Sequence, residues 1–424
     1  MRFVSRIHSR RRRVAALCLC LVLLLPSSVS ATPGVLTLED ALRIAESRAP
    51  LIDARQSGIA AAREEAARAG ALPDPMLTVG IDNLPVTGAD AFDPNADFMT
   101  MRRIGLRQEI PSRAKREARV ALAQRQVAEA RADAGAARLS VRRGTADAWI
   151  ELWAAQRELA ALQALRDQAR LAARLADARV AGGGASAGEA LAAKAAGLEL
   201  DNRIEAARAE LSAAQAGLAR WVGEDADVAA GESPGFDVLP HSQAELLGAI
   251  DRLGTLLPIV AGVETAASAI DVARAEKRPD WSVAASYGQR SGGSDMLMIE
   301  VGIGLPLFTR NRQDRGVAAR EAEYRAALAM RDDLRRQQAA RIRAGVARWQ
   351  GLKRQIALHE DALLPLAHDR STTALAAYRA GGPLQPWLDA RRDELSAHLS
   401  HVTHLRELGL AWAALAFLLP EDAS

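Results

Sequence analysis

Apolar residues follow two different periods along this chain, and each period predicts a different kind of element. In six long stretches they recur every three or four residues, which is the spacing of a helix with one buried face. In four short stretches they alternate with polar or small residues, which is the spacing of a strand. The expected helices span residues 36–70, 113–180, 187–222, 242–277, 311–379 and 385–419, and the expected strands span 76–84, 101–110, 281–289 and 296–307.

The order of these elements occurs twice, about 200 residues apart. Trp149-Ile150-Glu151-Leu152 is echoed by Trp349-Gln350-Gly351-Leu352, and Arg179-Val180-Ala181-Gly182-Gly183 by Tyr378-Arg379-Ala380-Gly381-Gly382. A repeat of this length indicates a duplicated half-molecule and not a solenoid unit. We expect an export signal over residues 1–31, a first repeat over 32–222, a linker over 223–240 and a second repeat over 241–424.

The first 31 residues have the composition of an export signal. A basic segment with six arginines precedes an apolar run from Val14 to Leu25, and Val29-Ser30-Ala31 is an acceptable cleavage site. The run is too short to cross a bilayer as a helix. Both cysteines lie within it, so the mature chain has none. Removal of the six arginines changes the formal net charge from +3 to −3, which leaves no charge argument for a nucleic-acid partner.

The lengths of the helices predict how they pair. Each long helix is about as long as two shorter ones, so two short helices stacked end to end would cover one long helix. Pro50 and Pro258 predict a kink or a break within two of the shorter helices. The expected pairs are 187–222 and 242–277 along 113–180, and 385–419 and 37–70 along 311–379.

The four strands have the pattern of a membrane-spanning sheet. In residues 281–289 every second residue is apolar or aromatic and its neighbours are small or polar. Strands of roughly 9–11 residues with one apolar face are typical of outer-membrane barrels, and Trp281 and Phe308 stand where an aromatic girdle belongs. A soluble hairpin with one buried face would alternate in the same way. Four strands cannot close a barrel, and lipid offers no partner to an open edge, so a barrel requires three chains with twelve strands.

The glycine-rich motifs and the duplicated strand ends, Ile110-Pro111 and Leu305-Pro306-Leu307-Phe308, resemble the TolC-like outer-membrane factor family over the whole mature chain. The resemblance implies an α+β membrane protein: a homotrimer whose twelve-stranded β-barrel, four strands per chain, is continued by a long periplasmic α-helical barrel. It also implies a place in the outer membrane lipid of a Gram-negative-type cell, with a periplasmic adaptor and an inner-membrane resistance-nodulation-division pump as partners. Residues 73–86 and 97–103 resemble the CusC/CzcC heavy-metal efflux branch.

The breaks between consecutive long helices are the expected periplasmic tip. On the resemblance they dock the adaptor and form a gate, with Glu189 and Asp389 as gate carboxylates. A ring of carboxylates in a narrow aqueous pore favours cations. Glycines in an ordinary helical hairpin would explain the same sequence without a docking role. The expected docking residues are Gly182, Gly183, Gly184, Ser186, Gly381, Gly382 and Pro383.

Two Met-x-Met pairs stand at the start of the second strand of each repeat. Met99 with Met101, and Met296 with Met298, share parity with the polar residues of their strands. Thioethers are soft ligands suited to transient binding of Cu(I) or Ag(I). The alternative is that these methionines only fill space near the mouth of the barrel.

Three histidines, His398, His401 and His404, follow one another at a spacing of three. Imidazoles at this spacing on a helix are able to share a metal, but these also border an apolar seam. His359 and His368 are isolated in the sequence and predict nothing.

No enzyme motif occurs: there is no nucleophile motif, no phosphate-binding loop and no zinc signature with a base, and no cofactor is expected. The expected function is a passive outer-membrane duct of a tripartite efflux system, which exports heavy-metal cations such as Cu and Ag or Co, Zn and Cd. One alternative is a duct for organic drugs or a secreted polypeptide. A second is a soluble periplasmic coiled-coil adaptor or scaffold.

Overall fold

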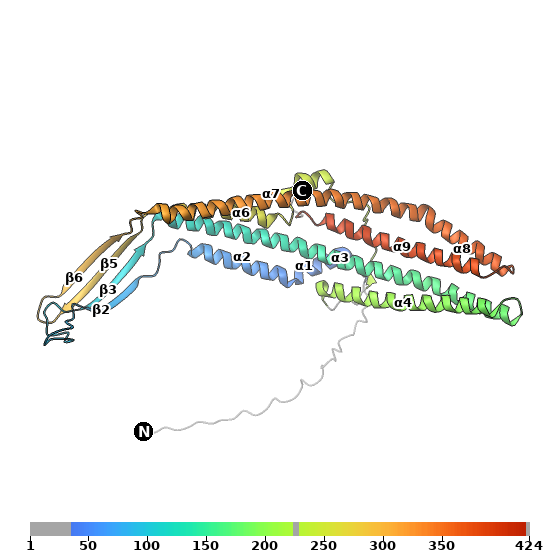
Figure 1. Cartoon of the computed structure of the whole chain (residues 1–424), viewed down its shortest axis with the longest axis horizontal. Helices are drawn as coiled ribbons and strands as arrows, with labels where there is room; N and C mark the ends of the chain where they lie inside the picture. Colours follow the sequence, from blue (N-terminus) through green and yellow to red (C-terminus); the bar gives the residue numbers. More distant parts are fainter. Residues whose placement is uncertain (1–34, 224–228, 421–424) are drawn as a thin grey trace, which may run out of the picture. The chain divides into compact units, whose positions relative to one another are not determined.

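A computed structural model describes residues 35–223 and 229–420 (Figure 1). The expected export signal lies outside the described residues, as do residues 224–228 of the expected linker. In chain order the elements are β1 (Val35–Leu36), α1 (Leu38–Arg48), α2 (Pro50–Arg68), β2 (Met76–Asp82), β3 (Met101–Ile110), α3 (Arg113–Ala181), α4 (Ala187–Val222), β4 (Ala229–Ala230), α5 (Gln243–Gly248), α6 (Leu257–Ala275), β5 (Trp281–Arg290), β6 (Met296–Ile303), α7 (Gln313–Leu358), a π-turn (His359–Leu363), α8 (Leu364–Arg379) and α9 (Gln385–Ala416).

Side-chain caps and prolines set the helix boundaries. The Thr37 hydroxyl accepts from the Asp40 amide at the start of α1, and Ser112 does the same for Lys115 at the start of α3. Pro50 begins α2, so the break expected there occurs. The helix expected over 242–277 is also divided, because a 3₁₀ turn follows α5 and Pro258 stands in the first turn of α6.

The long helix expected over 311–379 is interrupted. Residues 359–363 form a π-turn, in which the Leu364 amide donates to the His359 carbonyl five residues back. Pro365 explains the interruption, because proline has no N–H and its ring would collide with the carbonyl four residues earlier in a regular helix. The first long helix has no proline and runs unbroken for 69 residues.

The four longer strands form one antiparallel sheet in the order β2-β3-β5-β6. The register places Arg103 opposite Gly288, and Ile104 opposite Tyr287, so that polar and apolar residues separate onto two faces. One face carries Thr78, Asp82, Met101, Arg103, Gly105, Arg107, Ser282, Ser286, Gly288, Met296, Met298 and Glu300; the other carries Leu77, Val79, Ile81, Ile104, Leu106, Trp281, Val283, Tyr287, Leu297, Ile299, Val301 and Ile303.

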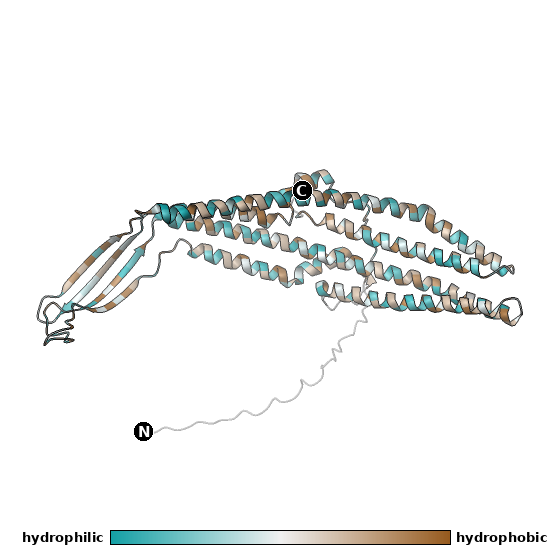
Figure 2. Cartoon of the chain, viewed as in Figure 1, coloured by the Kyte–Doolittle hydropathy of each residue, from teal (hydrophilic) through white to brown (hydrophobic). Residues whose placement is uncertain are grey.

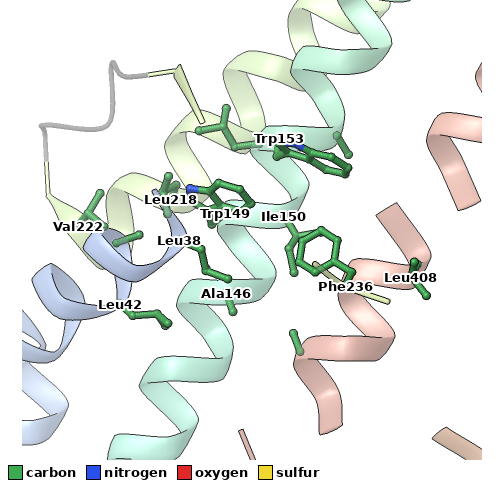
Figure 3. Packing of buried hydrophobic residues seen from close by; sticks show 14 of the residues in the cluster. Leu38, Leu42, Ala146, Trp149, Ile150, Trp153, Leu218, Val222, Phe236 and Leu408 are labelled. Carbon is green, nitrogen blue, oxygen red and sulfur yellow. The ribbon is translucent and has the colours of Figure 1, made fainter. Parts of the chain in front are cut away.

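The largest buried cluster lies where the middle of α3 meets α1, α4 and α9 (Figure 3). Trp149 and Ile150 are fully buried there. The Trp149 indole donates to the Leu36 carbonyl at 2.8 Å, and the Trp349 indole donates to the Phe236 carbonyl at the same distance. The donors and the acceptors are both 200 residues apart. Phe236 belongs to the segment expected to be a linker, which therefore contributes to the core.

The helices pair partly as their lengths predicted. The long helix α3 packs against α4 and α6, and α9 packs against α7 and α8, as expected. The prediction for residues 37–70 is wrong within this chain, because α1 and α2 pack against α3 and not alongside the second long span. Matching lengths do not say which long helix a short one covers. Figure 2 shows hydrophobic and hydrophilic residues interspersed along the helices, as paired amphipathic helices require.

Candidate functional site

Two tight turns end the long helical spans, and we call them together the tip. The first joins α3 to α4 through Gly182, Gly183 and Gly184 (Figure 1). Gly183 has a φ of 72°, and the Gly184 amide donates to the Arg179 carbonyl at 2.8 Å, which closes the end of α3. Ser186 and Glu189 form a reciprocal capping box at the start of α4.

The second turn joins α8 to α9 through Gly381, Gly382 and Pro383. Gly381 has a φ of 101°, a value that favours glycine. The Gly382 amide donates to the Ala377 carbonyl at 3.0 Å. No side chain caps the start of α9, where Pro386 occupies the first turn instead. The two turns therefore use the same glycine chemistry at the helix end but different chemistry at the following helix start.

Arg179 connects the two turns. Its guanidinium donates to the Gly184 carbonyl of its own turn at 2.9 Å, and to the Gly382 and Gly381 carbonyls of the other turn at 3.0 Å and 3.3 Å. The guanidinium carbon also lies 4.6 Å from the centre of the Tyr378 ring. Arginine fits this role because it presents several N–H donors in a fixed fork. One side chain thus satisfies carbonyls at the ends of both long spans.

An apolar cluster supports this connection. Tyr378 and Trp387 are buried, and their rings are nearly parallel with centres 6.4 Å apart. Ala176, Ala190, Ala193 and Leu384 complete the buried set, so α3, α4, α8 and α9 all meet beneath the tip. The Tyr378 hydroxyl is buried and has no hydrogen-bond partner among the described residues.

The two expected gate carboxylates lie near the starts of α4 and α9: Glu189 is in the first turn of α4, and Asp389 follows the first turn of α9. Glu189 accepts from the Ser186 amide at 3.3 Å as part of the capping box. Asp389 accepts from Gln385 at 2.9 Å and lies 3.9 Å from Arg392. Each carboxylate therefore has a local partner on its own helix.

A second polar cluster lies about three helical turns from the tip, between α8 and α9. Glu394 is buried and accepts from Arg391 on its own helix, and its oxygen lies 3.0 Å from Nδ1 of His368 on α8. Burial opposes ionisation, but Ser371, His368 and Arg391 together hold the pKa of Glu394 below its ordinary value. No local sequence pattern predicted this cluster, because His368 and Ser371 lie on α8, whereas Arg391 and Glu394 lie on α9.

The sheet brings two of the four expected thioethers together. Met101 on β3 and Met298 on β6 both approach the space above Gly288, and their Sδ and Cε atoms lie 3.2 Å and 3.5 Å from where a side chain at Gly288 would begin. Met296 instead receives a hydrogen bond from Arg290 at 3.3 Å. Met99 lies before β3 and is exposed. Arg103 with Asp82, and Arg107 with Glu300, form ion pairs on the same face.

The described residues leave the apolar face of the sheet uncovered. Val79 on β2 and Ile299 on β6 are 75% and 73% exposed. The two expected girdle residues are exposed as well, and Trp281 begins β5 while Phe308 follows β6. Exposed apolar area of this extent marks a surface that another phase or another chain covers.

An ionic cluster that the sequence did not indicate joins the two halves where strands meet helices. The Lys115 ammonium, at the start of α3, lies 2.7 Å from Asp280 and 3.4 Å from Glu276. Asp280 also accepts from the Ser112 amide at 2.9 Å. Because Asp280 directly precedes β5, this cluster fixes the end of β3 beside the start of β5.

The histidines arrange themselves differently from the sequence expectation. His401 and His404 on α9 contact His359 of the π-turn, with ring centres 6.0 Å and 4.9 Å apart. His398 takes no part in these ring contacts. Across the described residues, no three or more histidine, cysteine, aspartate or glutamate side chains lie where they could share a metal ion.

None of the described helices combines the length and the apolar composition that crossing a membrane requires.

The chain matches the family model described as "Outer membrane efflux protein" over residues 41–224 and 252–420. No curated protein matches the sequence. The fold is similar to that of the outer membrane protein VceC from Vibrio cholerae, with a TM-score of 0.72 and 21% identity over 90% of this chain and 96% of VceC. It is also similar to a membrane protein from Pseudomonas aeruginosa, with a TM-score of 0.77 and 19% identity over 91% of each chain. For CusC the TM-score is 0.75, with 14% identity over 90% of this chain and 92% of CusC.

Proposed function

Because the chain belongs to the outer membrane efflux protein family, whose members are transport channels and not enzymes, we propose that it is the outer-membrane duct of a tripartite system that exports heavy-metal cations. In this proposal the duct is passive. An inner-membrane resistance-nodulation-division pump supplies the energy, and a periplasmic adaptor connects the pump to the tip.

The two-faced sheet with open edges carries the proposal that three chains assemble. Among the described residues, strands β2 and β6 each pair with one neighbouring strand. In lipid, unpaired backbone groups at a sheet edge are too costly to persist, so the edges must pair with other copies. Three copies of this four-stranded sheet close a twelve-stranded barrel with its apolar face toward lipid and its charged face toward water.

The helices support a periplasmic extension. The 69 residues of α3 extend about 100 Å at ~1.5 Å per residue. The second long span is covered within the chain as well, because α6 packs against α7 and α9 packs against α7 and α8. The equivalent indole bonds of Trp149 and Trp349 support a duplicated half-molecule.

The tip is the proposed docking and opening region. Gly182, Gly183, Gly184 and Ser186 in the first turn, and Gly381, Gly382 and Pro383 in the second, expose backbone at the end of the helices. Arg179 holds the two turns together, so opening requires its hydrogen bonds to the second turn to break. In the trimer, Glu189 and Asp389 would line the opening and favour cations.

The choice of metal cations as the substrate rests on the sheet. Met101 and Met298 meet on the polar face, which would line the barrel, and thioethers bind soft ions such as Cu(I) and Ag(I). Because two thioethers bind weakly, such a site suits an ion in passage. The same geometry leaves export of organic compounds as the second candidate, since thioethers also form adaptable apolar surfaces.

A growth-inhibition panel on a deletion strain tests the substrate. We expect hypersensitivity to metal salts, and not to dyes, detergents or antibiotics, with full complementation by the wild type. A Met101→Leu/Met298→Leu variant is expected to complement poorly for Cu or Ag. The matched control is Met76→Leu, which is expected to complement fully. Met76 lies on the same face of the sheet, at the end of β2 that is farther from Met101. Sensitivity to organic compounds alone would reject the metal substrate and leave the duct standing.

A further inference from the structure

Three imidazoles gather at the one place where the second long span is irregular. His359 begins the π-turn, and His401 and His404 lie on α9 opposite it. The His359 and His404 rings meet edge to face at 4.9 Å between centres, and those of His359 and His401 are stacked at 6.0 Å. His359 is only 8% exposed. The Nδ1 atoms of all three are buried and have no hydrogen-bond partner among the described residues.

This arrangement suits neutral imidazoles. A protonated imidazole carries a charge and a donor on both nitrogens, and a buried charge without a partner is costly. Glu360 of the π-turn is a partly compensating charge for His401, whose Nε2 lies 3.7 Å from its carboxylate. Burial and the nearby His404 lower the pKa of His359. Burial also lowers the pKa of His401; Glu360 opposes that shift, whereas His359, His398 and His404 add to it. No described ionic group of α3, α7 or α8 contributes to either shift.

The location makes the contact easy to open. A π-turn has wider, less regular hydrogen bonding than the helices on either side, and Pro365 removes one donor from it. Local opening concentrates where few backbone bonds must break. The imidazole contacts join this weak segment to α9.

We propose that the His359–His401–His404 cluster is a pH-sensitive joint, in which protonation releases the π-turn from α9. Neutral imidazoles pack together and hold the second span closed onto α9. Protonated imidazoles repel one another and require water, so the segment opens. The joint lies between the core around Trp149 and the tip, so opening frees the α8–α9 hairpin to move.

The direction of the pH effect follows from linkage. In the closed state the pKa values of His359 and His401 are below the ordinary value of 6.5, whereas in the open, hydrated state they return toward it. Opening therefore takes up protons as the pH falls below about 6.5. Each proton taken up favours opening about tenfold per pH unit, down to the lowered pKa of the closed state.

Amide hydrogen exchange on the full-length detergent-solubilised protein tests the proposal. Between about pH 7.5 and 5.5, where carboxylates stay ionised, we expect amides of residues 357–364 and 399–405 to exchange about tenfold faster at the lower pH, after correction for intrinsic exchange. Residues 157–165 of α3 are expected to show no such change. The His359→Gln variant should lose the pH response, and His241→Gln, outside the cluster, should keep it. If His359→Gln does not fold, His404→Gln replaces it.

A pH response that is equal in wild type and His359→Gln, or absent from the wild type, overturns the joint. The consequence for tip opening rests on the proposed function, but this experiment requires no transport. A failed joint and a failed efflux assignment are therefore separate results.

Discussion

The two long spans of this chain differ at one decisive place. Span one is the single helix α3, whereas span two is α7, a π-turn and α8. In span two, Pro365 lacks a backbone N–H donor. The corresponding position in span one, 200 residues earlier, is Leu165, which is buried in a cluster with Leu162 and Ile204. The two spans thus share a helical period, while a single proline changes the hydrogen-bonding pattern of the second. Span one is therefore one continuous helix, whereas span two contains the π-turn at which we propose a pH-sensitive joint.

The largest expected effect comes from placing a proline in the stiff span. Ala164 is exposed on α3, so Ala164→Pro changes the backbone with little loss of packing. We expect a loss of about 3 kcal/mol or more, because α3 has no π-turn to accommodate the ring. Ala164→Gly, the matched control, should cost about 1 kcal/mol. Urea denaturation of both variants measures the difference, and equal costs would show that α3 tolerates interruption as span two does.

A smaller effect is expected for the ion pairs that connect the two helices of each hairpin near the tip. The first hairpin is α3–α4 and the second is α8–α9. In the second, the buried Glu394 joins α8 to α9, and Glu394→Gln should cost about 2–3 kcal/mol because Arg391 loses its charged partner. In the first, Lys194 and Asp177 pair at 3.1 Å in solvent, and Lys194→Gln should cost less than about 1 kcal/mol.

The pH dependence of the Glu394 contribution has a defined sign. Its pKa is lowered in the folded state, so its stabilisation is complete above the ordinary value of 4.5 and is lost as the pH falls through the lowered value. Thermal denaturation between about pH 7 and 3 should show the wild type losing more stability than Glu394→Gln. Parallel curves would contradict the assignment.

The two equivalent indoles, Trp149 in span one and Trp349 in span two, differ in how deeply they are buried. Trp149 is fully buried, whereas Trp349 is partly exposed, although each donates the same kind of hydrogen bond. We expect about 2 kcal/mol of lost stability for Trp149→Phe and about 1 kcal/mol for Trp349→Phe, because only the first leaves a cavity that water cannot fill. Equal losses would mean that the hydrogen bond alone determines the cost.

The smallest effect is expected for Pro365→Ala. It restores the missing donor in span two, so the π-turn should become more regular and its amides should exchange more slowly. Net stability should change by less than about 1 kcal/mol, since the regular helix moves His359 away from His401. Faster exchange in the variant would show that proline stabilises the turn and does not cause it.

Much of the fold was predictable because it depends on local signals. Period, caps and prolines gave the strands, the breaks at Pro50 and Pro258, and the Gly-rich turns to within a few residues. Pro365 carried an equally local signal, but the strong helical period on both sides obscured it. Contacts between distant segments left no local signal: Arg179 reaching the second turn, Lys115 with Asp280, and His359 with His404 all depend on which helices lie together.

The number of chains in the membrane assembly is the measurement that bears most directly on the proposed closed barrel. We would fractionate the cell envelope, extract the protein from the outer membrane in mild detergent and measure its mass by native mass spectrometry. We expect three copies per particle, which form ion-conducting pores in planar bilayers, because only closure satisfies the free edges of β2 and β6. A monomer, or a protein released without detergent, would contradict the closed barrel and with it the proposed duct.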